Sequence, residues 1–558
     1  MASHEIEVPV LIVGAGPTGL MASLLLEQVG VPTLVVDRRE SHKRAPAAHV
    51  VNARTLEICR SAGVDMAATE AASQKPEDAG WVYFVTKLGG TVLGRLPFER
   101  QGDDQLSVTP TPLRNLSQNR FEPLLLEALA RLGCAPRWSV QWQEHEETGR
   151  GVVSRLLDRT TGEVTIVRSR YLLGADGAGS RIRRSLGIQL EGPERLGSFV
   201  MVHLRASLRD RVDDPPGLLF FLNHPDAEGC YVIHDLDSEA VYMHPYDPDR
   251  EPLESFDEAR CRSLVQSSLE DPGLDFTIEN VSAWTMTAQV AERYRRGPVF
   301  LLGDAAHRFP PTGGLGLNSG VQDAHNLAWK LAFVSSGRAR PGLLDSYERE
   351  RRPVARSNAD QSLANAFKLI EVPQAVGFHD AADRAAALAA TLADPEALLR
   401  VQAAVANQAR HFDMPDLQLG FVYADGAVVL EPGEEPPRPD LEGELRPTGA
   451  PGCRLPHAWL TGGGSLLDVV PYDRFLLLAG PEGGAWITAA ESLADPRLAA
   501  RPLTEAVLPE IDAWLSTAGI DPDGALLVRP DQHVAWRACT SSKDARGRLV
   551  AVLSRLLD

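Results

Sequence analysis

Three glycines near the N-terminus have the spacing of a phosphate-binding turn. Gly14, Gly16 and Gly19 come directly after the apolar run Val8 to Val13, and the ten residues that follow them have helical character. In a strand–turn–helix unit the first glycine permits the tight turn, the second admits a pyrophosphate, and the third allows close packing of helix on strand. The helix N-terminus adds free N–H groups and a positive dipole end. The pattern predicts a nucleotide site.

An acidic residue ends the second strand of the same unit. Thr33 to Asp37 is apolar up to its last residue, and Asp37 follows the third glycine at the distance that this motif requires. A carboxylate there can accept hydrogen bonds from a ribose hydroxyl pair. Together with the turn, Asp37 favours an ADP-binding site. The alternative interpretation is a tight turn in an ordinary α/β fold.

Two more glycine-rich segments follow apolar strands. Residues 164–173 are predicted as strands and end in Gly-Ala-Asp-Gly-Ala-Gly-Ser at 174–180; residues 299–302 end in Gly-Asp-Ala-Ala-His at 303–307. A second glycine loop at 310–316 then leads into a long helix predicted from near Leu317 to about Ser336. His307 has no partner at ligand spacing, so a packed, hydrogen-bonded histidine is favoured over a metal ligand, and no metal site is predicted.

Composition narrows the class of protein. The 558 residues suggest roughly three to four domains. Forty-four per cent are hydrophobic and 23% charged, which excludes a disordered chain, a collagen and a membrane bundle. A net charge of −19 opposes binding to nucleic acid or anionic lipid. Six scattered cysteines without a C-x-x-C, and no signal peptide, favour a cytoplasmic protein. The uncharged stretch 8–26 contains prolines and glycines, so we expect no membrane span.

The remaining pattern indicates how the chain is organised. Residues 84–100 alternate around Gly89-Gly90 and predict a hairpin, and residues 190–290 favour an antiparallel sheet that suits a substrate-covering layer. Residues 121–132 and the alanine-rich stretch after Arg356 are predicted to be helical. A Pro, Gly and Glu-rich linker at 431–452 precedes a small α/β domain. Arg44 and Arg54, in the segment HKRAPAAHVVNARTLEI, are also compatible with solvated surface charges.

Three motifs together resemble the single-component, class A FAD-dependent aromatic hydroxylases. They are VLIVGAGPTGL near the start, GADGAGSRIRRSLGI at 174–188 and VFLLGDAAHRFPPTGGLGLNSGVQDAHNLAWKLA at 299–332. PGCRLPHAWL at 451–460 and LLVRPDQHVAWRA at 526–538 resemble the thioredoxin-like domain of the phenol and polyketide hydroxylase branch. HVVNARTLEI and LSQNRFEPLLLEAL are similar to segments of chlorophenol and natural-product hydroxylases. Lacking a C-x-x-C, the C-terminal domain is expected to be structural.

The resemblance implies an α/β fold with three parts. We expect a Rossmann-like FAD-binding domain from residues 1–75, 101–189 and 290–400. An antiparallel β-sheet substrate domain is expected from residues 76–100 and 190–289. Residues 401–452 are assigned as a linker and residues 453–558 as the thioredoxin-like domain.

The family motifs also imply the residues that hold FAD. Asp37 would hold the adenosine ribose, Gln118 would face the phosphates and ribityl chain, and Asp304 would bind a ribityl hydroxyl. Asp176 and Gly177 match a motif that serves both FAD and the nicotinamide donor, and Leu317 stands where the family often has methionine. The implied FAD-binding set is Gly14, Gly16, Pro17, Thr18, Gly19, Asp37, Arg38, Arg44, Gln118, Asp176, Gly177, Asp304, Gly316, Leu317 and Asn318.

The reaction implied by the resemblance is hydroxylation of an aromatic ring. NADPH would reduce FAD, and O2 would add to form a flavin C4a-hydroperoxide that attacks a phenol ortho or para to its hydroxyl, with water excluded. A phenol with a pKa near ~10 needs a base or a hydrogen-bond acceptor. His49 is the candidate, with a structural histidine as the alternative, and the Pro311 carbonyl is placed near the reacting oxygen. Tyr231, His234 and Tyr242 either line the pocket or are packing residues.

Other functions stay open at this point. A flavin oxidase, reductase or desaturase would use the same FAD site, and a simple (chloro)phenol hydroxylase is an alternative to an enzyme of secondary metabolism. A tryptophan halogenase is disfavoured because W-x-W-x-I-P is absent. An NAD-dependent dehydrogenase would explain only the first 37 residues, and a cofactor-free binding protein would be colourless. The expected partners are a small aromatic substrate and O2, with neither nucleic acid nor membrane, and a homodimer is possible.

Overall fold

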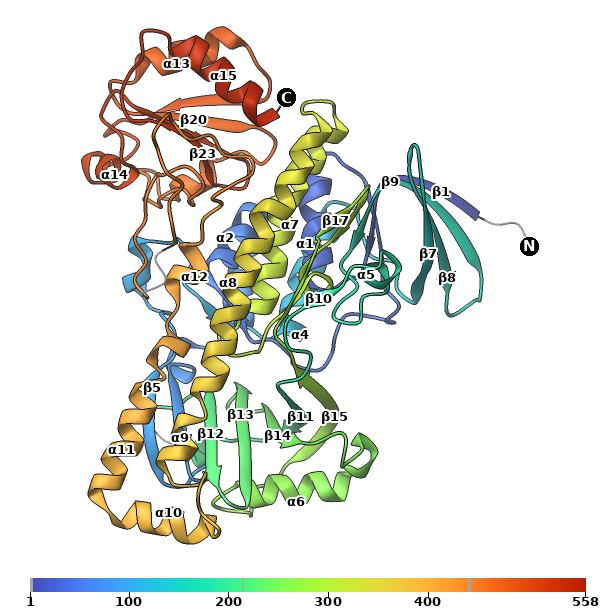
Figure 1. The fold of residues 1–558 in the computed structure, drawn as a ribbon, viewed down its shortest axis with the longest axis vertical. Helices are drawn as coiled ribbons and strands as arrows, with labels where there is room; N and C mark the ends of the chain where they lie inside the picture. The colour runs from blue at the N-terminus through green and yellow to red at the C-terminus, as the bar shows by residue number, and fades with distance from the viewer. Residues whose placement is uncertain (1–3, 213, 440–442, 558) are drawn as a thin grey trace.

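A computed structural model describes residues 4–212, 214–439 and 443–557. Figure 1 shows three parts in a row: the C-terminal domain at the top, a nucleotide-binding type of domain in the middle, and a second sheet at the bottom. The long helix α8 (Ser346–Lys368) runs from the top of the middle part to the lower sheet. Residues 440–442, within the predicted linker, lie outside the described residues.

The middle domain is built on a mostly parallel sheet. Its order is β17 (Arg295–Arg296), β18 (Val299–Leu301), β9 (Val164–Gly174), β1 (His4–Val13) and β2 (Thr33–Val36). β18, β9, β1 and β2 pair in parallel, while β7 (Val140–Thr148) and β8 (Gly151–Asp158) extend β9 as an antiparallel meander. The parallel strands are apolar because helices cover them, as a sheet of this kind requires.

Those helices meet at small residues. The covering helices are α1 (Pro17–Gln28), α4 (Gln118–Arg131) and α7 (Leu315–Ser335), close to the predicted limits. A Cβ on Gly320 would lie 2.2 Å from the Thr18 hydroxyl oxygen, and one on Gly303 would lie 2.6 Å from it. Two glycines therefore let the Thr18 side chain sit between α1, α7 and the loop after β18.

The lower sheet has seven strands. Its order is β15 (Thr277–Met286), β11 (Gly197–Arg205), β14 (Glu239–Tyr246), β13 (Ala227–Asp235), β12 (Leu219–His224), β4 (Trp81–Val85) and β5 (Val92–Pro97). All neighbours are antiparallel except β12 and β4, which are parallel. β4 and β5 form the expected hairpin. Helix α6 (Glu258–Ser268) packs on one face.

The opposite face of this sheet carries three more helices. They are α9 (Glu371–Ala375), α10 (Arg384–Ala393) and α11 (Pro395–Ala406). Val372, Val401 and Val405 share a buried cluster with Phe84 and Leu219 of the sheet. Residues 371–400 therefore pack with the lower sheet, which revises their expected place in the FAD-binding domain, and α11 extends into the stretch expected as linker.

The C-terminal domain has thioredoxin-like topology. Its sheet order is β21 (Leu498–Pro502), β20 (Phe475–Ala479), β22 (Ala525–Val528) and β23 (Val534–Ala538), with β20 and β21 parallel and β22 antiparallel to both of its neighbours. Helices α13 (Gly484–Leu493), α14 (Ile511–Ala518) and α15 (Ala545–Leu557) complete it. The cysteines are free. The predicted α/β fold class is thus confirmed.

Short elements connect these layers. The pair β3 (Val50–Val51) and β6 (Arg114–Asn115) lies where the middle domain meets the lower sheet, and β10 (Leu190–Glu191), β16 (Gln289–Ala291) and β19 (His307–Arg308) form a third small sheet. The remaining helices are α2 (Ala53–Ser61), α3 (Met66–Ala72), α5 (Arg181–Ser185) and α12 (Pro415–Leu419). None of the helices in the described ranges has the length and apolarity to cross a bilayer.

Candidate active site

The three glycines of the first turn have three different environments. Gly14 has φ +110°, and a Cβ there would lie 2.1 Å from the Ala175 carbonyl oxygen. A Cβ on Gly19 would lie 1.9 Å from the Gly14 carbonyl oxygen. Beside Gly16, in contrast, a Cβ would have no neighbour within 4 Å, and Pro17 begins α1 directly afterwards. Gly14 and Gly19 are thus required by packing, whereas Gly16 leaves an open cradle at a helix N-terminus, which fits a pyrophosphate.

Asp37 lies buried beside this turn. Its carboxylate accepts the Ala15 N–H at 2.8 Å and the Arg39 N–H at 2.8 Å, and it pairs with the Arg39 guanidinium at 3.0 Å. Arg38 is exposed. The acid therefore stands where the sequence predicts it, while Arg39, its actual ion partner, was missed because neighbouring arginines look alike in a sequence.

Gln118 belongs to a polar cluster at the start of α4. Its side-chain NH2 donates to Glu122 at 2.7 Å, and the other Glu122 oxygen accepts the Lys43 backbone N–H at 2.8 Å. The Glu122 carboxylate is fully buried, and burial lowers the pKa of the Lys43 ammonium. Arg44 is exposed. These contacts hold the 43–44 segment against the first turn of α4, next to Asp304, whose charge acts on Lys43.

The second glycine segment combines a helix cap with an unpaired arginine. Asp176 accepts the Ser180 hydroxyl at 2.6 Å and the Arg181 N–H at 2.7 Å, so its carboxylate caps α5. Gly177 has φ +80° and open space where a Cβ would be. Arg183 is 7% exposed, yet its Nε and Nη1 have no hydrogen-bond partner, and the same holds for Nε of Arg308. Burial, then the charge of Arg308, lowers the pKa of Arg183. Together the buried Arg183 and the half-buried Arg308 suit an anion.

The third segment is held from behind by a buried acid. Asp323 of α7 accepts the Gly303 N–H at 3.0 Å, binds His307 Nε2 at 2.8 Å and pairs with Arg351 Nε at 2.7 Å. His307 also stacks on Phe309 at 4.8 Å. No cluster of metal-ligating side chains occurs among the described residues. His307 is thus a packed, hydrogen-bonded side chain. Asp323 and Arg351 were missed because their partners are distant in sequence.

Asp304 lies in the short turn Gly303–Ala305, which contacts α7. Asp304 is exposed, in contrast to its neighbours Gly303 and Ala305. Gly314 caps α7 with φ +62°, and Gly316 has no atom within 4 Å of a Cβ position. The first N–H groups of a helix lack intrahelical acceptors, so this end presents donors and a positive dipole.

Asn318 connects α7 to the strand that follows His49. Its side-chain NH2 donates to the Val50 carbonyl at 2.9 Å and to the Gly314 carbonyl at 2.6 Å, and its oxygen accepts the Asn52 N–H at 2.9 Å. The side chain is therefore fully engaged with the protein. Leu317 is half-buried. Pro311 is exposed, and its carbonyl accepts the Gly314 N–H at 3.0 Å, closing a turn.

His49 has an unpartnered buried nitrogen. Its Nε2 has no hydrogen-bond partner, and burial lowers the pKa of its imidazole to about 4. The ring of His234 lies 6.0 Å away, edge-on, at a point where the pairing of β13 with β14 shifts register. Burial, followed by the charges of His49, His203 and Arg120, also lowers the pKa of His234. Both rings are neutral at pH 7, so each can accept one hydrogen bond.

Tyr231 and Tyr242 do not share the face of His234. They stack on one another at 4.8 Å in the cluster that packs on α6; Tyr231 bonds Ser268 at 2.5 Å and Tyr242 donates to the Glu228 carbonyl at 2.7 Å. Side chains alternate between the two faces of a strand. This placement revises the expectation for the two tyrosines: the sheet itself separates them from His49.

A wall of aromatic rings starts beside His49, at Phe98, instead. Phe98 lies 6.3 Å from His49 and 6.2 Å from Phe412, and Phe221 lies 6.1 Å from Phe412 and stacks on Phe84 at 5.0 Å. These phenylalanines come from β4, from β12, from the residue after β5 and from the short 3-10 helix Ala409–Phe412. No local pattern marks them, so the sequence interpretation missed them.

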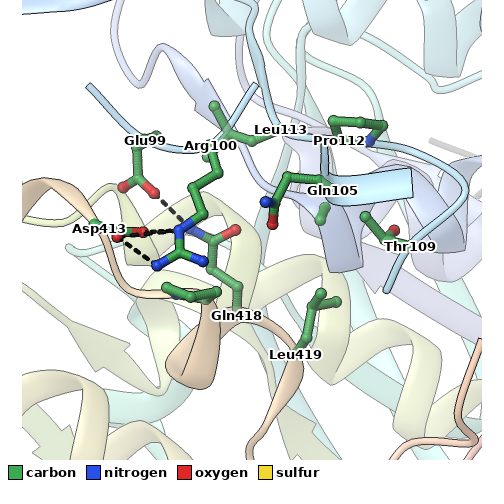
Figure 2. Close-up of a pocket in the computed structure, with 11 residues that line it drawn as sticks. Glu99, Arg100, Gln105, Thr109, Pro112, Leu113, Asp413, Gln418 and Leu419 are labelled. Carbon is green, nitrogen blue, oxygen red and sulfur yellow. Dashed lines mark hydrogen bonds and ion pairs between the residues drawn. The ribbon is translucent and has the colours of Figure 1, made fainter. Parts of the chain in front are cut away.

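A small pocket adjoins the outer end of this wall (Figure 2). There the Glu99 N–H donates to the Phe412 carbonyl at 2.8 Å, and the Arg100 guanidinium pairs with Asp413 at 2.8 Å. Burial, and then the charge of Asp413, raises the pKa of Glu99 to about 8. Gln418 donates to Glu99 at 2.8 Å. These contacts join the residues that follow Phe98 to those that follow Phe412.

Two protein-family models match this chain. Residues 7–362 match the FAD binding domain family, and residues 448–558 match the family described as aromatic-ring hydroxylase, C-terminal. The chain belongs to the FAD-dependent aromatic-ring hydroxylases. Membership makes FAD the cofactor and monooxygenation of an aromatic compound the reaction class.

Individual relatives cover nearly the whole chain. A tetracenomycin A2 monooxygenase-dioxygenase from Streptomyces glaucescens is 33% identical, over 99% of this chain and 97% of the relative. A 2,4-dichlorophenol 6-monooxygenase from Cupriavidus pinatubonensis is also 33% identical, over 99% and 96%. The crystal structure of the flavin-dependent monooxygenase PieE, in complex with FAD and substrate, superposes with a TM-score of 0.92 at 36% identity and covers 99% of each chain.

Within this hydroxylase fold the open positions fit FAD. Gly16, Gly177 and Gly316 have free space at their Cβ positions, Asp304 is exposed, and the charges of Asp304 and Lys43 act on one another. Gly16 and Gly316 lie at the N-termini of α1 and α7, where N–H groups without intrahelical acceptors are available. When bound there, FAD would supply the redox chemistry and the activation of oxygen.

Proposed function

We propose that this hydroxylase acts on a phenolic, polycyclic aromatic substrate, using NADPH and O2. The observation that carries the proposal is the neutral, unpartnered Nε2 of His49 on a wall of phenylalanines. Flat apolar walls favour aromatic rings, and the single acceptor nitrogen suits a phenolic hydroxyl. One relative is named a tetracenomycin A2 monooxygenase-dioxygenase and another a putative polyketide hydroxylase, which supports a substrate of antibiotic biosynthesis.

In this mechanism His49 orients the phenol and takes its proton. With a pKa of about 4, the imidazole is a weak base, so in the resting complex it accepts a hydrogen bond from the phenol hydroxyl. As the ring is attacked, positive charge develops on the phenol oxygen and its proton moves to Nε2. The Phe98 and Phe412 rings exclude water from this proton and from the reacting carbon. His234 is the next ring able to relay the proton.

The binding site proposed for the electron donor consists of Arg183, in the segment that follows Gly177, and Arg308. Arg183 and Arg308 are buried or half-buried cations that each leave a buried guanidinium nitrogen without a partner. Guanidinium groups bind phosphate oxygens through paired hydrogen bonds. A nicotinamide dinucleotide would thus dock through its phosphates at the mouth of the FAD site, with no second glycine turn of its own.

A simple chlorophenol hydroxylase is the second candidate. The 2,4-dichlorophenol 6-monooxygenase relative favours it, because its identity to this chain equals that of the tetracenomycin relative. Both candidates use His49 in the same way and differ only in the size of the ring system.

The test is anaerobic reduction of the purified, yellow holoenzyme by NADPH, with 2,4-dichlorophenol, with a hydroxylated tetracyclic polyketide, or with neither. We expect the tetracyclic phenol to accelerate flavin bleaching and, in 18O2, to gain one labelled oxygen. Acceleration by dichlorophenol alone would assign the second candidate. Equal bleaching without any phenol, with stoichiometric peroxide release in air, would contradict both and indicate an oxidase.

A further inference from the structure

A buried charged network joins the C-terminal domain to the rear of the FAD-binding domain. Its core is the loop 529–533 between β22 and β23, which is fully buried. Arg529 pairs with Glu350 of α8 at 2.8 Å and with Asp531 at 2.6 Å, and Glu350 pairs with Lys330 of α7 at 2.6 Å. In Figure 1 the C-terminal domain sits over this end of α7 and α8.

The same loop contacts helix α2 through hydrogen bonds with Arg54. The Arg54 guanidinium, 1% exposed, donates to the Asp531 carbonyl at 2.7 Å and to the Gln532 side-chain oxygen at 2.7 Å. It also pairs with Glu57 at 2.9 Å, and Glu57 in turn accepts Arg454 Nε at 2.8 Å. Although burial raises it, the charges of Arg454 and Arg54 hold the pKa of Glu57 below its usual value.

Arg54 is close in sequence to the residues that connect α2 with the N-terminus of α7. It is two residues from Asn52, the N-cap of α2, whose N–H is bound by Asn318 of α7 at 2.9 Å. Asn318 also binds the carbonyls of Val50 and Gly314. A displacement of α2 would therefore move two segments together: strand β3, which directly follows His49, and the turn that begins α7.

We propose that Arg54 is a positioning residue, through which the 529–533 loop of the C-terminal domain sets the His49 strand and the start of α7 against the flavin. The guanidinium is suited to this because its planar fork donates to two acceptors in fixed directions, which an ammonium cannot do. An interface that only held the two domains together would not need hydrogen bonds so close to the N-cap of α2. The part of this inference that concerns His49 rests on the proposed function.

The test compares two mild variants with a matched destabilising control. Arg54→Lys keeps the charge beside Glu57 but loses the fork. Gln532→Asn shortens the acceptor while suiting the positive φ of +63° at that position. The control, Leu515→Ala in α14, lowers stability inside the C-terminal domain, because Leu515 belongs to a cluster confined to residues 455–534.

Two readouts need only the flavin: the dissociation constant of FAD, from titration of the full chain, and amide exchange of the holoenzyme. We expect Arg54→Lys to weaken FAD roughly tenfold and Gln532→Asn about threefold, each with a changed shape of the bound flavin absorption band. Exchange should accelerate at residues 50–53 and 314–318 but not in the turn at 14–19. Leu515→Ala should leave all of these at the wild-type values.

The inference fails if the two variants fold, bind FAD normally and exchange like wild type at 50–53 and 314–318. It also fails if Leu515→Ala reproduces their effects, since the domain would then act through stability alone. A third readout, peroxide released per NADPH consumed with an accepted phenol, should rise several-fold in Arg54→Lys. If no phenol is hydroxylated, the proposed function fails while the flavin readouts still decide the positioning role.

Discussion

The arginines buried in two regions of the molecule differ in how they are paired. In helix α5, Arg183 keeps two guanidinium nitrogens without protein partners, and beside His234 of the lower sheet His49 keeps an unpartnered Nε2. On the side that meets the C-terminal domain, Arg54, Glu350 and Arg529 have their charges paired and hydrogen-bonded. A buried polar atom without a partner lowers the stability of the fold, and a ligand that hydrogen-bonds to it can offset this cost. A buried polar atom that is already paired inside the protein supports the fold instead. We infer that the region of Arg183 and His49 is the ligand side of the domain and that the paired network is its supporting side.

The largest expected effect comes from breaking the supporting side. Burial raises the pKa of Glu350, but Arg529 and Lys330 together bring it down to about 2. Glu350→Ala would leave Arg529 and Lys330 without this carboxylate, and we expect the free energy of unfolding to fall by about 3–5 kcal/mol. Urea unfolding measures this. Arg209→Ala, which removes the exposed pairs with Asp78 and Asp237, is the control and should change stability little.

Acid should destabilise the protein through buried neutral histidines. Burial lowers the pKa of His411 to about 3, whereas in the unfolded chain it is near 6.5. The unfolded state therefore binds the extra proton between these values, so stability is complete above pH 6.5 and is lost as the pH falls towards 3. His411→Phe should avoid roughly 4 kcal/mol of this loss at the acid end. Urea midpoints at pH 4.5 and 7 test it; exposed His379→Phe should keep the wild-type slope.

On the ligand side, His49→Ala should lower the rate of hydroxylation by about a hundredfold, because the phenol loses its proton acceptor. In the variant, the rate should rise with pH as the phenol itself ionises, while the wild-type rate stays flat above pH 5 because His49 is already neutral. Single-turnover kinetics across pH measure this. FAD affinity should be unchanged; a matching loss of FAD would instead give His49 a structural role.

The unpaired arginine should matter for the donor alone. Arg183→Gln should raise the KM for NADPH roughly tenfold, because a charged hydrogen bond to phosphate is lost, and leave the KM for the phenol unchanged. The neighbouring Arg184 is exposed, so Arg184→Gln is the matched control. Steady-state kinetics with varied NADPH decide the point. Equal effects of the two variants would indicate general charge attraction rather than a phosphate site.

The smallest effect is expected on the far face of the sheet. Tyr231→Phe removes only the hydrogen bond to Ser268 and should lower the free energy of unfolding by about 1 kcal/mol. Thermal unfolding and phenol KM should be measured together. An unchanged KM would agree with the placement of Tyr231 against α6, whereas a large rise in KM would bring it back into the substrate site.

The local sequence was sufficient to predict the features that depend on a few consecutive backbone residues. The turn at Gly14, Gly16 and Gly19, the acid Asp37 and the helix that begins at Leu315 could be predicted, since steric demands on glycine and helix ends act within a few residues. The thioredoxin-like topology of the C-terminal domain agreed with its motifs. These features also carried the recognition of the family.

Tertiary structure alone decided which side chains meet. Tyr231 and His234 are three residues apart, but the face each one takes depends on strand register and on the irregularity at His234. Arg54 looked like a surface charge, yet it is buried against Asp531 and Gln532. Nothing near Arg54 in the sequence reports a partner almost five hundred residues away, because burial of a charge is set by long-range packing. The chemistry could be foreseen from the chain, but its support could not.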